Sequence, residues 1–404
     1  MSHFPVRQCV FLLEPTEPHG ETDTPPHALM QCGDRPFLAW LMREMQRFGI
    51  EDFVLLATEQ SVLHFETAVE LIRSRLPKPA NITLLTAPHQ AGSGGMLHHA
   101  RQHLQECFLF CYGEVLFTGN LARFLTHAGQ GNWALLRVDD SDEQESLACP
   151  GEDDEKVAPS LLTTQHNYPA AFEKSGIFLF DHSIFQYLTA ACSLEQDVLP
   201  ALVKHGVLKG LSLPGDVWDV RRPEDRAKAK RHLSTTLLRP AVFLDRDGVI
   251  NYDHGWVGTR DRFEWEPDVL KTIAKITDSG HHVFIVTNQS GIARGFYTED
   301  HLEQLMSWVI DTIREHGGTV DDWRYCPMHP EAVVDRYRGQ SPNRKPSPGM
   351  ILDLSSRWEL DPARCVMFGD QISDIQAAEA AGIKGVRVGP LLLSELASQM
   401  SAFQ

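Results

Sequence analysis

The sequence lacks long apolar runs and any excess of basic residues. No apolar stretch approaches the roughly 18 residues of a bilayer-spanning helix, and no basic start with a long apolar core opens the chain. Its 37 Lys and Arg against 54 Asp and Glu give a formal net charge of -17, which disfavours a general binder of phosphate backbones or anionic membranes. We therefore expect a cytoplasmic protein with no nucleic-acid and no membrane partner.

Regular cysteine spacing, repeats and low-complexity tracts are also missing. The 8 cysteines contain no C-x-x-C pair, which argues against a disulfide framework. A hydrophobic share of 42% and a charged share of 23% are ordinary globular values. The 404 residues leave room for two or three hydrophobic cores.

What the chain does have is an alternation of β-rich apolar runs with helical patterns, which predicts two doubly wound, mostly parallel-sheet α/β domains of Rossmann-like type. A helical pattern at 223–233, followed by a new strand, places the domains at 1–235 and 240–404. The acidic segment 139–160 is predicted to be a solvated loop. The predicted strands are 10–13, 53–58, 81–86, 108–113, 133–138, 176–180, 242–245, 281–288, 322–326, 365–370 and 385–389, and the predicted helices include 37–48, 119–129 and 299–317.

Chemistry-bearing residues follow the strands of the second domain. Asp245 and Asp247 end the run FLDRDG, and Thr287, Lys345 and Asp370 come at later strand ends, where open α/β sheets place their sites. Taken singly, each could be a turn, a helix cap or half of an ion pair. Their order along the chain resembles the haloacid dehalogenase superfamily, in particular its phosphatase branch, over about residues 240–390.

Physical chemistry suggests a role for each of these groups. A carboxylate nucleophile, Asp245, divides phosphate ester hydrolysis into two steps, while Asp247 serves as general acid and then general base. Oxygen ligands that include Asp370 suit Mg²⁺. Thr287 and Lys345 supply hydrogen-bond donors and positive charge to the transferring phosphoryl group.

The resemblance adds further expectations about the metal and the lysine. It implies that Asp245 and Asp370 bind Mg²⁺ by their side chains and Asp247 by its backbone carbonyl. Asp374, in the run GDQISD, is expected to orient Lys345 or a metal-bound water. About 40 residues separate Asp247 from Thr287, which leaves no room for a large cap domain.

A closer resemblance covers FLDRDGVIN, VTNQSGIARGFYT, C-P-x-H-P, RKP-x-PGM and GDQISDIQAA. These runs are similar to the D-glycero-D-manno-heptose 1,7-bisphosphate 7-phosphatases, which are kin to the histidinol-phosphate phosphatases. The resemblance implies that Arg344 helps to select the sugar phosphate. It also implies that Asn288, Ser290 and Arg294 lie beside the substrate.

One departure concerns a structural zinc loop of that family, which has four soft ligands. The corresponding positions here are Cys326, Met328, Ser341 and Asn343, and His329 stands one place late for the missing histidine. Only one of the four ligands is kept, so we expect no structural zinc. The loop must then be held by packing.

The first domain resembles the sugar-phosphate nucleotidyltransferases, in the runs PPHALMQCGDRPFLAWLMREMQRFGIEDF, AGSGGMLHHA, SGIFLFD and GDVWDVRRPEDRAKA. That family cradles a nucleotide triphosphate with a glycine-rich loop after the first strand. Here the loop reads LLEPTEPHGETDTPP, in which proline lacks an N–H and Glu14, Glu17 and Glu21 would repel phosphate. His27 replaces the family's lysine.

The metal positions of that resemblance are only partly kept. Glu114 replaces an aspartate and Asp219 retains its carboxylate. We expect the first domain to be catalytically degenerate. Three roles stay open for it: binding a sugar phosphate, forming a homo-oligomer, and positioning the second domain.

The leading hypothesis is therefore a Mg²⁺-dependent phosphatase that removes the 7-phosphate of a heptose 1,7-bisphosphate, a step in lipopolysaccharide or capsule precursor synthesis. One alternative is a bifunctional enzyme whose first domain makes a nucleotide-activated heptose. Others are a histidinol-phosphate-type phosphatase and a non-catalytic scaffold. Oligomeric state, substrate anomer and regulation stay open.

Overall fold

The computed structural model describes residues 6–13, 25–128, 131–137, 160–161 and 176–388. Two segments discussed above, the loop containing Glu14, Glu17 and Glu21 and the acidic run from 139, lie outside the described residues. Among the described helices, none combines the length and apolar character needed to cross a membrane. The chain divides into two compact units, Met1–Thr235 and Thr236–Gln404, and each is described by itself.

The first unit contains, within its described part, an eight-stranded sheet in the order β5-β4-β1-β6-β10-β8-β11-β9. Its inner strands β4, β1 and β6 run parallel, whereas β10 is antiparallel to both of its neighbours. The strands are β1 Gln8–Leu13, β4 Asp52–Thr58, β5 Asn81–Ala87, β6 Cys107–Tyr112, β8 Asn132–Arg137, β9 Ser160–Leu161, β10 Ile177–Asp181 and β11 Leu208–Leu213.

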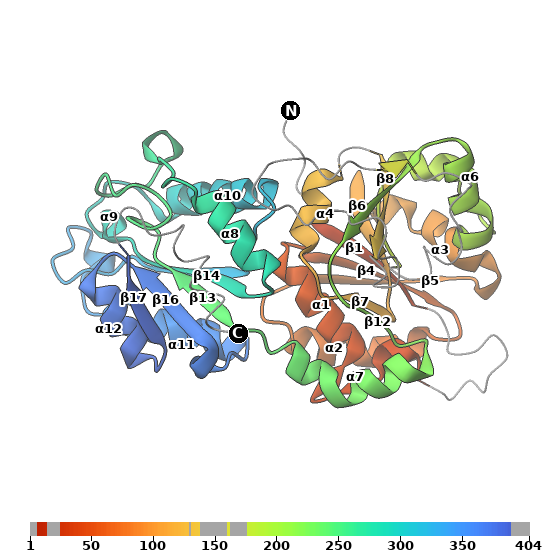
Figure 1. The fold of residues 1–404 in the computed structure, drawn as a ribbon, viewed down its shortest axis with the longest axis horizontal. Coiled ribbons are helices and arrows are strands. Elements are labelled where there is room, and N and C mark those ends of the chain that lie inside the picture. Colours follow the sequence, from red (N-terminus) through yellow and green to blue (C-terminus); the bar gives the residue numbers. More distant parts are fainter. Residues whose placement is uncertain (1–5, 14–24, 129–130, 138–159, 162–175, 389–404) are drawn as a thin grey trace, which may run out of the picture. The chain divides into compact units, whose positions relative to one another are not determined.

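Shorter strands and six α-helices complete the described part of this unit (Figure 1). The small strands are β2 Gln31–Cys32 with β3 Arg35–Pro36, and β7 Val115–Phe117 with β12 Val217–Asp219. The helices are α1 Phe37–Arg47, α2 Val62–Ser74, α3 Gly92–His99, α4 Leu121–His127, α6 Leu199–Lys204 and α7 Pro223–Thr236.

The second unit is built on a five-stranded sheet in the order β15-β14-β13-β16-β17, in which every pairing is parallel. Its strands are β13 Ala241–Leu244, β14 His282–Asn288, β15 Asp322–Cys326, β16 Cys365–Gly369 and β17 Lys384–Arg387. Its helices are α8 Val269–Asp278, α9 Ser290–Ala293, α10 Glu299–Glu315, α11 Gly349–Arg357 and α12 Ile372–Ala380.

Helices cover both faces of this sheet, because alternate strand residues point to opposite sides. Val242 and Leu244 of β13 pack with residues of α8 and α10. Ala241 and Phe243 pack with residues of α11 and α12. Figure 1 shows the two helical layers on either side of β13, β14 and β16. Because all five strands run parallel, their carboxyl ends meet at one edge of the sheet, and the loops that follow them converge there.

The sequence predictions of element type agree well with this architecture. Each of the eleven predicted strands overlaps an observed one, and both sheets are mostly parallel α/β layers, which confirms the fold class. The strands β2, β3, β7, β9, β11 and β12 were not predicted. Five of them are only two or three residues long, and β11, LKGLSL, carries a lysine and a glycine that weaken its apolar pattern.

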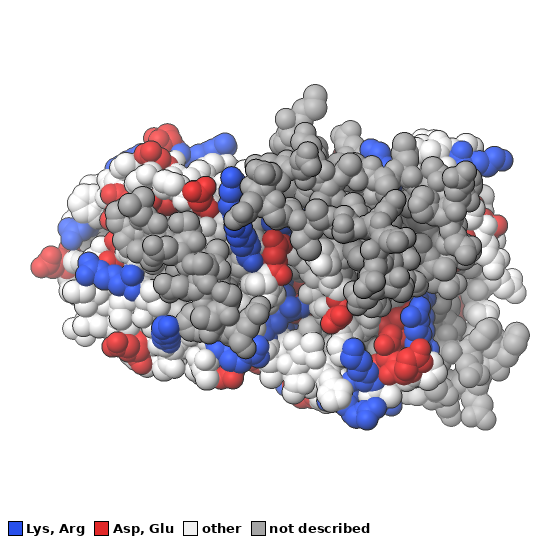
Figure 2. Space-filling view, viewed as in Figure 1, with Lys and Arg blue, Asp and Glu red and all other residues white. Residues whose placement is uncertain are grey.

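The described residues on the face drawn in Figure 2 carry Lys, Arg, Asp and Glu side chains in small, interspersed groups. Both signs of charge lie close together there, although the whole chain is strongly acidic. Such mixing is typical of a solvated protein surface.

Candidate active site

Asp245 and Lys345 form the buried centre of the second unit's site. Asp245 follows β13 directly, and its N–H continues the sheet ladder to Phe368 O at 3.0 Å. Lys345 Nζ lies 2.8 Å from Asp245 Oδ1 and 2.8 Å from Asp374 Oδ1, and it donates to Val286 O at 2.9 Å. The three protons of the ammonium group thus have three acceptors, which compensates for its almost complete burial.

The electrostatics of this centre depend on the balance between burial and charge. Burial raises the pKa of Asp245 to about 7, with the Lys345 ammonium opposing and the Asp374 carboxylate adding to the shift. For Lys345, burial disfavours the charged form, but Asp245 and Asp374 outweigh it and raise the pKa. The site is therefore arranged so that a further positive charge would favour ionised Asp245.

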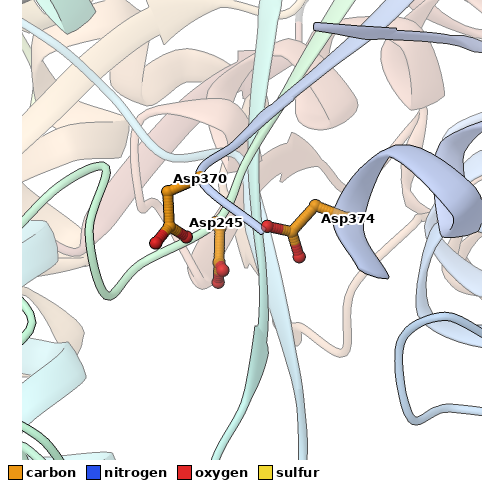
Figure 3. A group of neighbouring side chains, drawn as sticks. All are labelled: Asp245, Asp370 and Asp374. Carbon is orange, nitrogen blue, oxygen red and sulfur yellow. The ribbon is translucent and has the colours of Figure 1, made fainter. Parts of the chain in front are cut away.

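Three carboxylates, those of Asp245, Asp370 and Asp374, converge at the edge of the sheet (Figure 3). One oxygen of each lies within 4.8 Å of the others. Asp370 follows β16, and burial raises the pKa of its carboxyl. Gln371 Nε2 donates to Asp370 Oδ2 at 2.6 Å, while Oδ1 is buried without a hydrogen-bond partner among the described residues. An orphaned carboxylate oxygen in such a cluster fits a hard cation such as Mg²⁺.

Two glycines make room for these carboxylates. Gly248 has φ +82°, and a Cβ there would lie 2.7 Å from Asp370 Cγ. At Gly369, a Cβ would lie 2.3 Å from Asp374 Cβ. Side chains at these positions would displace two of the clustered carboxylates, so the glycines of the D-x-D-G and G-D motifs have a steric cause.

Asp247 points into a separate set of donors. Arg246 Nη2 donates to both of its carboxylate oxygens, at 2.7 and 2.8 Å, and Asn251 Nδ2 donates to Oδ1 at 3.0 Å. Gln289 Nε2 donates to Oδ2 at 2.9 Å. The Asp247 side chain is therefore not part of the carboxylate group formed by Asp245, Asp370 and Asp374. The metal contact expected for Asp247 is made by its backbone carbonyl, and it stays a prediction. Each of these three neighbours donates to the carboxyl group and so fixes its orientation.

Gln289 links Asp247 to Thr287. Its Nε2 also lies within hydrogen-bond distance of Thr287 Oγ1 at 2.9 Å, and its Oε1 accepts from Tyr297 OH at 2.6 Å. Thr287 and Gln289 are each 1% exposed. This buried chain of hydrogen bonds fixes the end of β14 relative to Asp247.

Asn288 is hydrogen-bonded to the backbone of Lys345. Its Nδ2 donates to Lys345 O at 3.0 Å, and its Oδ1 accepts from Lys345 N at 3.1 Å. Both ends of the amide are thus used to hold the backbone of the lysine loop. Ser290 begins the short helix α9 and is half-buried.

Arg294 and Arg344 form a basic group close to His329. Arg344 Nη1 donates to Met328 O at 3.0 Å, and burial together with the charge of Arg294 lowers the pKa of the Arg344 guanidinium. Burial and both arginines also lower the pKa of His329. These groups are close enough to act on one another electrostatically, so they provide a positive field beside the lysine loop.

The loop between β15 and Lys345 is anchored by hydrogen bonds as well as by packing. Tyr325 OH and Tyr337 OH both donate to Glu299 of α10, and these bonds lower the pKa of the Glu299 carboxyl. Val333 N and Val334 N donate to Ala293 O at 2.9 and 3.0 Å. Cys326, the one retained position of the zinc pattern, is 1% exposed in the core under α11.

In the first unit, an arginine occupies the position beside Asp219. Arg221 Nε and Nη2 donate to Asp219 Oδ1 and Oδ2 at 2.8 and 2.9 Å. Pairing of β7 with β12 brings Glu114 close, since Val220 N donates to Glu114 O at 2.9 Å. Burial works against the charge of Arg221, but Asp219 and Glu114 together raise the pKa of its guanidinium.

Two other segments that carry the transferase resemblance, at His27 and at Gly94–Gly95, also contact other parts of the first unit. His27 contacts Arg226 Nη1, and burial together with this charge lowers the pKa of the imidazole. At the start of α3, Gly94 N and Gly95 N donate to Cys192 O at 3.0 and 3.1 Å. A Cβ on Gly95 would lie 2.6 Å from Ala190 O. These glycines therefore allow a neighbouring chain segment to pack closely.

Four residues that hold the second unit's site were given no role by the sequence: Arg246, Asn251, Tyr297 and Glu299. The first three lie inside the motif runs FLDRDGVIN and VTNQSGIARGFYT, which was a detectable signal. Glu299 accepts hydrogen bonds from two tyrosines across the fold, and no local pattern marks it.

The comparisons with known proteins agree with this geometry. The family described as "HAD-hyrolase-like" matches residues 342–389. The D-glycero-beta-D-manno-heptose-1,7-bisphosphate 7-phosphatase of Rhodopseudomonas palustris is 50% identical over 149 residues, 37% of this chain and 83% of that protein. Its counterpart in Escherichia coli K12 is 42% identical over 144 residues, 36% of this chain and 75% of that protein.

Two solved structures are also similar. One is D,D-heptose 1,7-bisphosphate phosphatase from B. bronchiseptica complexed with magnesium and phosphate, with 28% identity, a TM-score of 0.36, and coverage of 41% of this chain and 99% of that one. The other is HddC from Yersinia pseudotuberculosis, with 18% identity, a TM-score of 0.43, and coverage of 56% of this chain and 98% of that one. On the sequence relatives, the chain belongs to the D-glycero-β-D-manno-heptose-1,7-bisphosphate 7-phosphatase family.

Proposed function

We propose that the second unit is a Mg²⁺-dependent phosphatase that removes the 7-phosphate of D-glycero-D-manno-heptose 1,7-bisphosphate. The observation that carries the proposal is Asp245, a buried carboxylate at a strand end, ion-paired with Lys345 at 2.8 Å. The names of the sequence relatives support the choice of substrate. We place the reaction in the cytoplasm, with a small sugar phosphate as the partner.

Asp245 is the nucleophile in this scheme. Its carboxylate oxygen attacks phosphorus, the bond to the sugar oxygen breaks, and an aspartyl phosphate forms. Asp247 donates a proton to the leaving sugar oxygen and then accepts a proton from the water that releases inorganic phosphate. The hydrogen bonds from Arg246 and Gln289 orient the Asp247 carboxyl group.

Lys345 and Thr287 stabilise the charge that spreads over the phosphoryl oxygens. Asp374 holds Lys345 Nζ at 2.8 Å and, through Oδ2, accepts from Gln371 N at 3.0 Å. Asp374 is thus a positioning residue for the lysine. Because Asn288 is bonded at both ends to the Lys345 backbone, we assign it the same kind of role.

Asp245 and Asp370 are the side chains that would hold Mg²⁺, together with the backbone carbonyl of Asp247. Bound there, the cation would offset the repulsion between the carboxylates and the phosphate and polarise the phosphoryl group. Arg344, Arg294 and Ser290 would face the rest of the substrate, with the two arginines attracting its second phosphate. Tyr325 and Tyr337, at the two ends of the segment before the Arg344 loop, are hydrogen-bonded to Glu299.

For the first unit, the chemistry favours a degenerate transferase site over the bifunctional alternative. Arg221 donates a hydrogen bond to each carboxylate oxygen of Asp219. The guanidinium group therefore takes the place that a metal ion would have beside this carboxylate. The backbone donors at Gly94 and Gly95 are occupied by Cys192 O. Binding a sugar phosphate, forming a homo-oligomer and positioning the second unit stay open as roles.

The test is phosphate release from the α and β anomers of D-glycero-D-manno-heptose 1,7-bisphosphate, with histidinol phosphate and hexose phosphates as competitors. We expect Mg²⁺-dependent release with a preference for the heptose, abolished in Asp245→Asn. Glu264→Gln, an exposed carboxylate on the same unit, is the matched control. Turnover of histidinol phosphate alone would reject the substrate, and no turnover of any phosphate would reject the activity.

A further inference from the structure

The strand β5 forms one edge of the first unit's sheet. Within the described residues it pairs only with β4, in parallel register from Asn81 to Ala87. Its other side therefore presents backbone N–H and C=O groups that no described strand satisfies. The strand has seven residues, whereas β9 at the opposite edge has two. The edge at β5 is thus an open template for pairing with another strand.

The second unit protects both edges of its sheet with charged side chains, and β5 has none. The edge strands there are β15, which carries Asp322 and Arg324, and β17, which carries Lys384 and Arg387. Charges on an edge strand oppose pairing with another chain, because they would lose water or meet like charges. The sequence of β5, NITLLTA, contains no charged residue, no proline and no glycine.

The middle of β5 is apolar and only partly covered. Leu84 and Leu85 are half-buried, although their register partners in β4, Leu55 and Leu56, are no more than 1% exposed. Ile82 is half-buried as well. The apolar interior therefore extends to the edge of the sheet. A strand added at this edge would cover these side chains, which is favourable for apolar surface.

The helix next to this edge is also apolar on its outer side. Helix α2 packs against β5, and its residues Leu63 and Leu71 are 69% and 45% exposed. Among the described residues of the first unit, Val207 is the one other exposed large hydrophobic side chain, and it lies outside both elements. The exposed apolar surface of this unit is thus concentrated beside its unpaired sheet edge.

Leu63, Thr67, Leu71 and Ser74 form a stripe along α2, called here the α2 stripe, because residues three or four apart share a helix face. Both hydroxyl groups in it are bonded to the helix itself. Thr67 Oγ1 donates to Leu63 O at 2.8 Å, and Ser74 Oγ donates to Leu71 O at 2.7 Å. An apolar surface can therefore cover the α2 stripe without leaving these donors unpaired.

The charge of the chain indicates what covers this surface. At a net charge of -17, two copies of the chain repel each other over most of their surfaces. They can approach where charge is absent, as it is along β5 and the α2 stripe. Around a two-fold axis at the middle of β5, the strand meets its own copy antiparallel, and every pair of facing side chains is uncharged.

We propose that the first unit forms a two-fold symmetric dimer with a second copy of this chain, in which the two β5 edges pair antiparallel and the two α2 stripes pack together. The proposal concerns the first unit and does not depend on the activity of the second. The strand is about 23 Å long and the helix about 20 Å, so each copy buries on the order of 400 Å². This area is below that of stable complexes, so the dimer should dissociate in the micromolar range.

Sedimentation velocity of the full chain between about 1 and 200 µM tests the proposal. We expect a concentration-dependent change from monomer to dimer. Leu63→Glu combined with Leu71→Glu should raise the dissociation constant at least about tenfold, because unpaired carboxylates would be buried. Thr86→Lys, at an exposed position of β5, should do the same. Val207→Glu, the matched control, adds a carboxylate outside this surface and should leave the dissociation constant unchanged.

The response to salt and a crosslink give independent readouts. Added NaCl should strengthen the dimer, because it screens the repulsion between two acidic chains and the contact contains no ion pair. Thr67 lies near the middle of α2, so the two-fold axis brings its two copies together. A short bis-maleimide should therefore link Thr67→Cys chains into covalent dimers beyond the level seen in the wild type. Val207→Cys should show no such increase.

Three outcomes overturn the proposal. Monomers at every concentration would show that a second copy does not cover the surface, whether another segment of this chain or a different protein does. A dimer that resists both the Leu63→Glu and Leu71→Glu combination and Thr86→Lys would be formed through another face. Equal weakening in Val207→Glu would show that added negative charge alone, and not its position, separates the copies.

Discussion

Gln289 Nε2 donates a hydrogen bond to Asp247 Oδ2 at 2.9 Å. The amide is oriented by Tyr297 OH, which donates to Gln289 Oε1 at 2.6 Å. The proposed general acid and base is therefore aligned by a side chain from the next strand end rather than by its own loop alone.

Replacing Gln289 by Leu should lower kcat by about 10- to 100-fold and leave KM nearly unchanged, because Asp247 loses alignment and not its contact with bound substrate. Steady-state kinetics on the heptose bisphosphate measure this. Tyr297→Phe is the graded comparison, since it keeps the amide and removes only the bond that orients it. A smaller loss in Gln289→Leu than in Tyr297→Phe would contradict the role of the amide.

Lys345→Met should abolish turnover and also destabilise the second unit. Two buried carboxylates, Asp245 and Asp374, would lose the cation that lies 2.8 Å from each. Breaking a buried pair costs about 3 kcal/mol, less any part recovered when one carboxyl takes up a proton. Urea unfolding of the metal-free protein at pH 7 measures the loss, and it should be smaller at pH 5. Equal losses at the two pH values would show that the carboxylates do not determine it.

Mg²⁺ affinity should rise with pH up to about neutrality. Burial raises the pKa of Asp245 to about 7, so below that pH the ion must displace a proton. Affinity should fall about tenfold for each pH unit below 7 and level off above it. Calorimetric titration between pH 5.5 and 8.5 measures the slope. Asp245→Asn should bind more weakly and with less dependence on pH, and a wild-type affinity that is flat across this range would falsify the prediction.

Glu299→Gln should make stability less sensitive to acid. Hydrogen bonds from Tyr325 and Tyr337 hold the pKa of Glu299 below its usual 4.5, so its stabilisation is complete above pH 4.5 and is lost as the pH falls through the lower value. The difference in Tm between wild type and variant should therefore be largest near pH 7 and shrink on acidification. Glu303→Gln, an exposed neighbour on α10, should show no such change.

Arg221→Gln should destabilise the first unit by about 2 kcal/mol, because buried Asp219 loses two charge-assisted hydrogen bonds. Phosphatase activity should not change. Arg222→Gln is the control, since Arg222 Nε lies 3.8 Å from Asp219 and its side chain is 43% exposed. Thermal unfolding followed with a first-unit probe measures both. Equal Tm values for the two variants would argue against a structural role for Arg221.

Much of the second unit could be predicted from its sequence. Asp245, Asp247, Thr287, Lys345 and Asp370 were placed at strand ends by the alternation of apolar runs and polar motifs, and the structure brings Asp245, Lys345 and Asp370 to one edge of the sheet. This succeeded because the direction of parallel strands fixes where their carboxyl ends meet. Local patterns of this kind need no knowledge of long-range packing.

Side-chain partners could not be predicted in the same way. Asn288 was expected beside the substrate, and no pattern indicated that both ends of its amide hold Lys345, 57 residues further along the chain. Arg221 lies in the run GDVWDVRRPEDRAKA, and only the fold shows it paired with Asp219. Such partners depend on side-chain rotamers and on close packing between segments that are distant in the sequence. A sequence pattern contains no information about either.

The fold class, the order of the strands along the chain and the strand-end positions of the candidate site residues follow from sequence patterns, because hydrophobic periodicity and motif order are local properties. The donors that hold Asp247, the pairing of Lys345 with both Asp245 and Asp374, and the contact between Trp256 and Phe296 follow only from the folded structure. Those relationships are set by distances between segments, and the packed core fixes such distances only when the whole domain folds.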